Sequence, residues 1–142
     1  MPGLICGAMV VDDNGRIAMV KEAKRSAYGK WNWPAGKIRP KEGIIAAARR
    51  EVKEETNLDI KILGLIGVYR DMTDNAIRVV FLARPVGGKI RYQRGELLDA
   101  RWFTEQELWK LSDKQLRRAD MKKVFRDWKS GKLYPLSVIK EF

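Results

Sequence analysis

The chain has 142 residues, 45% hydrophobic and 33% charged, which is enough core material for one folded domain over residues 1–142 and argues against disorder. Its 29 basic and 18 acidic side chains give a formal net charge of +11, which favours polyanionic partners such as nucleotides or RNA. It contains no histidine, which excludes a Ser-His-Asp triad, an imidazole base and a His-ligated zinc site.

The cysteine content and the N-terminus bear on the compartment. Cys6 is the single cysteine, so an internal disulfide is impossible, and its apolar neighbours favour a core residue over a reactive thiol. The first residues lack the basic-then-apolar layout of a signal peptide, and no apolar stretch approaches the roughly 20 residues that cross a bilayer. We expect a cytoplasmic protein without a membrane partner.

The N-terminal third predicts strands and loops. Apolar residues 4–11 and 17–20 flank the turn residues 12–15, which together predict a β-hairpin. Residues 21–30 are polar and predict a loop. The segment Trp31-Asn32-Trp33-Pro34-Ala35-Gly36 cannot be helical, because Pro and Gly interrupt it, and it should lead into a loop.

A helix and two strands are expected next. Residues 42–56 are rich in Ala, Arg, Glu and Lys and predict a helix, with Asn57 as a left-handed residue just beyond its end. Residues 60–70 and 77–84 have the composition of β-strands, separated by a turn region at 71–76.

Short strands and two helices are expected in the last third. Gly87-Gly88 predicts a turn, followed by strands at 89–92 and 100–103. Thr104-Glu105-Gln106-Glu107 matches a capping box and predicts a short helix to about residue 111. A second helix is predicted from residue 112 to about residue 130.

Three carboxylates share one face of the predicted 42–56 helix. Residues three and four apart are helix neighbours, so Glu51, Glu54 and Glu55 fall within an arc of roughly 100°. Beside them lies an apolar stripe that can pack on a sheet, formed by Ile44, Ile45, Ala48 and Val52. The like charges repel, and a hard divalent cation would compensate them. The alternative is a solvated acidic face with salt bridges to Arg49, Arg50 or Lys53.

The residues around this helix match a longer pattern. From Gly36 the chain fits G-x(5)-E-x(7)-R-E-U-x-E-E-x-G-U, where U is aliphatic, with Asn57 in place of the last Gly. The matching positions are Gly36, Glu42, Arg50, Glu51, Val52, Glu54, Glu55 and Leu58. This pattern resembles the Nudix box. Because Asn tolerates positive φ, the turn should survive the replacement.

The resemblance extends to the N-terminal hairpin, the Trp-x-x-Pro-Ala-Gly lead-in and the segment at 96–103, and it carries expectations. It implies an α+β fold, an α/β/α sandwich with a mixed β-sheet between helices. It implies Mg²⁺, with Mn²⁺ as a substitute, bound by Glu51, Glu54, Glu55 and the Ala35 carbonyl. Arg50 would orient the carboxylates, and Glu42 would stabilise the loop–helix junction rather than touch the metal.

The implied reaction is attack of water on phosphorus, with a carboxylate accepting the proton. Family members differ in which carboxylate is the base. Glu51 is the first candidate here and Glu96, in an expected loop, is the second. The alternative for Glu96 is an ordinary exposed side chain.

Two segments bear on the substrate. Residues 77–85 with Gly87-Gly88 are similar to a branch that cleaves nucleoside diphosphates, including oxidised guanine ones. Residues 130–136 are similar to a branch that removes phosphate from nucleotides and from a pyrimidine diphosphate precursor of thiamine. We therefore expect a nucleoside di- or triphosphate, with ADP-ribose or a nucleoside-diphosphate sugar as the alternative. A module of another class, a catalytically weak one that binds nucleotide or RNA, would be favoured if a box carboxylate were missing.

Basic and aromatic residues leave further alternatives. Residues 110–132 contain nine basic and three acidic side chains. They form either a nucleic-acid surface or, as we favour, the solvated face of a helix whose apolar side chains Leu116, Met121, Val124, Phe125 and Trp128 pack inward. Trp31 and Trp33 could stack on a substrate base or be structural. The sequence makes no prediction of an oligomeric state.

Overall fold

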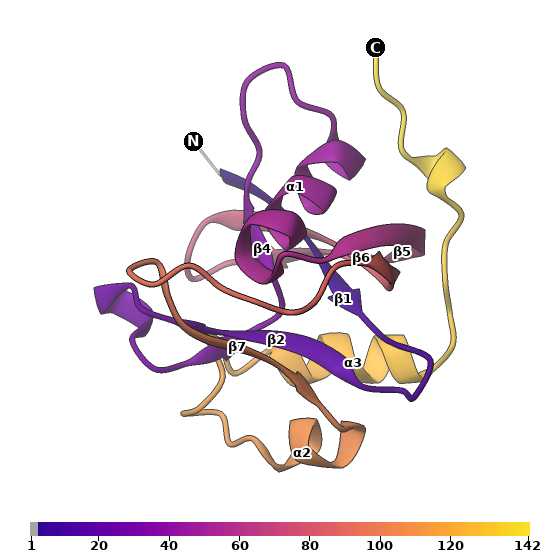
Figure 1. The fold of residues 1–142 in the computed structure, drawn as a ribbon. Coiled ribbons are helices and arrows are strands. Elements are labelled where there is room, and N and C mark those ends of the chain that lie inside the picture. The colour runs from indigo at the N-terminus through magenta and orange to yellow at the C-terminus, as the bar shows by residue number, and fades with distance from the viewer. Residues whose placement is uncertain (1–2) are drawn as a thin grey trace.

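The computed structural model describes residues 3–142, and within them one sheet has four strands in the order β4-β1-β6-β5 (Figure 1). Its strands are β1 (Gly3–Val10), β4 (Ala35–Lys37), β5 (Asp59–Asp71) and β6 (Ala76–Gly87). β1 and β6 run parallel, whereas β4 and β5 pair antiparallel with their neighbours, so the sheet is mixed as predicted.

A second, antiparallel sheet has three strands in the order β3-β2-β7, namely β3 (Trp31–Asn32), β2 (Ile17–Glu22) and β7 (Leu97–Phe103). Helix α1 (Ile44–Thr56) lies on one side of the sheets, and α2 (Glu105–Lys110) and α3 (Met121–Lys129) lie on the other (Figure 1). This arrangement confirms the expected α/β/α fold.

The two larger hydrophobic cores follow from the alternation of side chains along the strands. In β1, Cys6 and Ala8 point into a core with Val52 of α1, whereas Met9 points into a core with Phe125 of α3. Cys6 is fully buried, which confirms its reading as a core residue. Within the described residues, no helix combines the length and apolar character needed to cross a membrane. Residues 1 and 2, to which the signal-peptide prediction also refers, lie outside the described range.

The predicted N-terminal hairpin is wrong in its pairing. Both strands and the turn exist, with Gly15 at φ 76°, but β1 and β2 belong to different sheets and meet at an isolated bridge between Val11 and Ile17. The reason is that β4 and β6 occupy both edges of β1, so β2 pairs with β3 and β7 instead.

Two other predictions are wrong because the backbone groups of these segments form hydrogen bonds with distant parts of the chain instead. Residues 88–93 form no strand; instead the Arg91 N–H donates to the Thr56 carbonyl (2.9 Å) at the end of α1. The helix predicted from residue 112 begins only at Met121, because the preceding segment pairs with Trp31. The Trp31 N–H donates to the Gln115 carbonyl (2.7 Å), and the Arg117 N–H donates to the Trp31 carbonyl (2.8 Å).

The two ends of α1 are closed differently. Asn57 adopts φ 66°, the predicted left-handed cap, and its N–H donates to the Lys53 carbonyl. The N-cap is Gly43, which has no side chain to accept a bond, and the Ile44 N–H donates to the Glu141 carboxylate instead (3.0 Å). A Cβ on Gly43 would lie 2.6 Å from a Glu141 oxygen, so a side chain at this position would force the Glu141 carboxylate to shift.

Candidate active site

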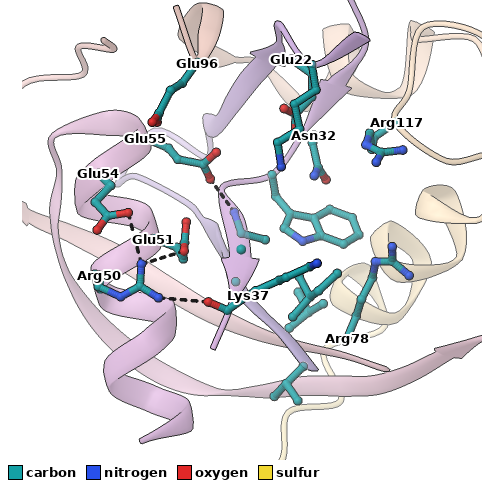
Figure 2. Close-up of a pocket in the computed structure, with 18 of the residues that line it drawn as sticks. Glu22, Asn32, Lys37, Arg50, Glu51, Glu54, Glu55, Arg78, Glu96 and Arg117 are labelled. Carbon is teal, nitrogen blue, oxygen red and sulfur yellow. Dashed lines mark hydrogen bonds and ion pairs between the residues drawn. The ribbon is translucent and has the colours of Figure 1, made fainter. Parts of the chain in front are cut away.

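A cavity of about 670 Å³ lies beside α1, a size that suits a nucleotide. Figure 2 shows the α1 carboxylates and Glu96 on one side of it and Arg78 and Arg117 on the other. Asn32 of β3 lies between the two sides. The cavity therefore has an acidic wall and a basic wall that face each other.

The acidic wall is built where β4 meets α1. Glu51, Glu54 and Glu55 all line the cavity, as the helical spacing predicts. A Cβ on Gly36 would overlap the Glu51 carboxyl group, so the glycine of the box is needed for that carboxylate to lie against the β4 backbone. The Ala35 N–H donates to Glu55 (2.7 Å), which fixes a second carboxylate to the same strand.

Arg50 connects the acids to one another. It donates from Nε (2.6 Å) and Nη2 (2.9 Å) to Glu42, and from Nη1 to Glu51 (2.7 Å) and Glu54 (3.2 Å). Its Nη2 also donates to the Lys37 carbonyl (3.1 Å). The hydrogen bonds from Arg50 lower the pKa of Glu42 to about 2, and the bond to Glu42 raises the pKa of Arg50 above its ordinary value. Glu42 thus lies at the loop–helix junction and holds Arg50 in place.

Burial raises the proton affinity of Glu51 and Glu55. Burial raises the pKa of Glu55 to about 9, with further increases from the Glu22 and Glu51 charges, against the lowering effect of the Ala35 N–H. Burial also raises the pKa of Glu51, which Arg50 partly opposes. Without an added cation, Glu55 therefore keeps a proton at neutral pH.

The donor set fits a hard cation in its chemistry. Within residues 3–142 the acids do not already converge as a cage, because Glu51 and Glu54 turn to Arg50 and Glu55 turns to Ala35. All three nevertheless offer oxygen to one cavity, and burial disfavours the charged form of Glu51 and Glu55 unless a cation is added. Oxygen ligands with excess negative charge are what Mg²⁺ and Mn²⁺ bind.

Of the other predicted site residues, some line the cavity and one lies in the hydrophobic core. Glu96 and Ala35 line the cavity. Trp33 also lines it, but is 1% exposed. Trp31 lies in the core, with its ring centroid 4.7 Å from that of Phe103, which favours a structural role over base stacking.

Several lining residues were not identified from the sequence. Among the charged and polar ones are Glu22, Lys24, Asn32, Lys37, Arg39, Arg78, Arg117 and Arg118. Arg78 gave a signal, since it is a charged residue inside an apolar strand, and it is 7% exposed. Arg117 and Arg118 belong to the basic 110–132 run but lie before α3, on the cavity. The α3 side chains Met121, Val124 and Phe125 are buried, which supports the solvated-face interpretation for the basic residues of the helix itself.

The comparisons with known proteins agree on a family. The family model described as the NUDIX domain matches residues 1–128. The chain is 38% identical over 104 residues to "8-oxo-dGDP phosphatase NUDT18" of Mus musculus, which covers 71% of this chain and 32% of that protein. It is 30% identical over 129 residues to "ADP-ribose pyrophosphatase" of Methanocaldococcus jannaschii, which covers 86% and 72%.

A solved structure gives the same result. "NUDIX hydrolase from Nitrosomonas europaea" superposes with a TM-score of 0.87 at 27% identity, and covers 100% of this chain and 98% of that one. The chain spans about a third of the length of the NUDT18 proteins that it matches.

Proposed function

Because the chain belongs to the NUDIX domain family, we propose that it hydrolyses a diphosphate linkage in a nucleoside di- or triphosphate and releases phosphate or pyrophosphate. The observation that carries this proposal is the set of carboxylates that Arg50 and the β4 backbone hold on one wall of a nucleotide-sized cavity. The likeness to a protein named 8-oxo-dGDP phosphatase supports a nucleoside diphosphate, including an oxidised guanine one.

Glu51, Glu54, Glu55 and the Ala35 carbonyl would hold Mg²⁺, for which Mn²⁺ substitutes. When bound, the cation supplies charge neutralisation at the phosphate oxygens and lowers the pKa of water. Arg50 is a positioning residue that keeps Glu51 and Glu54 oriented through its two bonds from Nη1. Because burial raises the pKa of Glu55, that side chain must lose its proton before it can act as a ligand, which links metal binding to pH.

Glu51 is our proposed proton acceptor for the attacking water. Its carboxylate lies against Gly36 and borders the cavity, and burial raises its proton affinity, as a general base requires. Glu96, on the loop before β7, is the second candidate. The kcat–pH profiles of Glu51→Gln and Glu96→Gln separate them, because loss of the base removes the acidic limb of the profile.

A second candidate function is pyrophosphatase action on ADP-ribose or a nucleoside-diphosphate sugar. The likeness to a protein named ADP-ribose pyrophosphatase supports it. A catalytically weak nucleotide- or RNA-binding module is less favoured, since every carboxylate of the box is present. The cytoplasmic location stays a prediction, and a nucleic-acid partner for residues 110–132 stays the less favoured alternative.

The test is a substrate panel assayed with Mg²⁺ and analysed for products. It comprises nucleoside di- and triphosphates, their oxidised forms, ADP-ribose, dinucleoside polyphosphates and capped RNA. We expect the nucleoside di- and triphosphates to have the highest kcat/KM. An advantage for ADP-ribose of about tenfold or more would overturn the substrate assignment and leave the diphosphate chemistry in place.

A further inference from the structure

Three arginines form the wall of the cavity that faces the carboxylates, and we call Arg78, Arg117 and Arg118 the arginine wall. Arg78 comes from β6, and the other two come from the segment between α2 and α3 that pairs with Trp31. Figure 2 shows Arg78 and Arg117 across the cavity from Glu51, Glu54 and Glu55. A substrate whose diphosphate lies at the carboxylates would reach this wall with its other end.

The arginine wall contains one guanidinium, that of Arg117, without an ion pair among the described residues. Arg78 is ion-paired with Asp74 and lies 4.0 Å from Asp71. Arg118 donates from Nε to Asp120 (3.2 Å). Within residues 3–142, Arg117 has no acidic partner within ion-pair distance. Its guanidinium lines the cavity, where it is available to an anion.

The guanidinium groups also repel one another. Arg78 is 7% exposed, so its charge is poorly screened by water. Burial and the neighbouring Arg78 lower the pKa of Arg118 to about 10. Buried like charges do not favour folding, and an anion between them would relieve the repulsion. Guanidinium groups suit phosphate, because their N–H groups can bond two of its oxygens at once.

The arginine wall offers hydrogen-bond donors rather than an exposed aromatic ring on which a base could stack. Trp33, the aromatic side chain among the described lining residues, is 1% exposed, and the Arg118 guanidinium lies 5.4 Å from its ring centroid. Stacking of a base on Trp33 would therefore require Arg118 to move. An anionic group can bind the wall as it stands.

Asn32 gives a second, independent sign of a ligand that crosses the cavity. It lies between the two walls and is 8% exposed, yet its Oδ1 has no hydrogen-bond partner among the described residues (Figure 2). A buried acceptor without a partner is costly, and a hydroxyl of the substrate sugar would satisfy it.

We propose that Arg78, Arg117 and Arg118 form a second anion-binding subsite, which takes a phosphate group carried by the substrate remote from its scissile diphosphate. The inference rests on the proposed function, because it assumes that the diphosphate lies at the carboxylates. It assigns as substrates those nucleotides that bear an additional phosphate on the sugar, with Asn32 accepting from a sugar hydroxyl between the two charged ends.

The test compares GDP and ADP with their 3′-phosphorylated counterparts in the wild-type protein and in variants. We expect kcat/KM for the 3′-phosphorylated nucleotide to exceed that for the plain one by about tenfold, mainly through KM. Arg117→Ala should remove most of this ratio, and Arg117→Lys should retain part of it. Arg126→Ala, an exposed arginine of α3 outside the cavity, is the matched control and should keep the wild-type ratio.

A binding measurement separates failure of the subsite from failure of the proposed function. Adenosine 3′,5′-bisphosphate has no diphosphate to cleave, and calorimetry can compare its affinity with that of AMP. We expect it to bind about tenfold more tightly in the wild type and to lose this advantage in Arg117→Ala. Equal affinities would overturn the subsite, whatever the turnover results. So would an Arg117→Ala variant that alters the preference between guanine and adenine and keeps the 3′-phosphate ratio.

Discussion

The carboxylate helix and the arginine wall face each other across the cavity, and they differ in how they are held. Glu51 and Glu54 share one cation, Arg50, which lies beside them on α1. Arg78 instead pairs with Asp71 and Asp74 near the β5–β6 turn, Arg118 pairs with Asp120 before α3, and Arg117 has no ion pair among the described residues. Glu51 and Glu54 are thus coupled through one cation, whereas the three arginines share no ion-pair partner. We infer that changes on α1 act together on the chemical step, and that changes on the opposite wall act singly on binding.

The largest expected effect tests the acidic side of this contrast. Glu54→Gln and Glu55→Gln should each lower kcat by about a hundredfold or more while the fold remains intact, because each removes a charged metal ligand. Steady-state assays with Mg²⁺ measure this. Glu105→Gln is the matched control, since Glu105 pairs with Lys129 at the surface and should keep wild-type turnover. Activity within about tenfold of wild type in both ligand variants would remove this site from consideration.

Gly36→Ala tests the position of the Glu51 carboxylate rather than its charge, since the variant leaves every charged residue in place. The added Cβ would overlap the Glu51 carboxyl group and displace it. We expect kcat to fall by about tenfold or more, because small displacements of reacting groups are costly. Gly3→Ala is the control, since a Cβ there has no neighbour within 4 Å. Equal kcat in the two variants would show that the position of Glu51 is not critical.

The pH dependence of stability tests the raised pKa that burial gives to Glu55. The folded chain keeps a proton on Glu55 up to a pKa of about 9, whereas the unfolded chain releases it near 4.5. The folded state therefore binds more protons in this interval, so the free energy of unfolding should fall as pH rises from 5 to 9. One such group contributes at most about 1.4 kcal/mol per pH unit.

Urea unfolding in EDTA measures this slope. Glu55→Gln should flatten it and be no less stable than the wild type at pH 8, since folding then no longer requires a proton to be taken up at this position. The low pKa of Glu42 acts below 4.5 and does not affect the interval. A wild-type stability that rises between pH 5 and 9 would contradict the assignment.

The smallest expected effect concerns the basic residues that lie beyond the arginine wall. Reversal of Lys122, Lys123 and Arg126 to Glu should leave nucleotide turnover within about threefold, if these residues only solvate α3. Assays at low and high salt measure it. A collapse of turnover that high salt reproduces in the wild type would instead extend the functional cationic surface from the cavity onto α3.

The two walls also differ in how far the sequence predicts them. The acidic wall depends on the i, i+3 and i+4 geometry of one helix and on Gly36, so a local pattern suffices. The arginine wall depends on the pairing of Trp31 with residues 115–117, which replaces a helix that local propensity favours. The hairpin prediction fails for the same physical reason, because apolar residues mark β1 and β2 as strands without specifying their partners. Strand pairing is decided by contacts that are distant along the chain.

The N-terminal cap of α1 can form only late in the synthesis of the chain. The acceptor for the Ile44 N–H is the Glu141 carboxylate, 97 residues downstream. A nascent chain therefore exposes the carboxylate helix long before the residue that closes its first turn has been synthesised. Leu136 and Ile139, which pack on the same core as α1, arrive equally late. The first turn of the carboxylate helix is thus closed by a residue that is synthesised well after the helix itself.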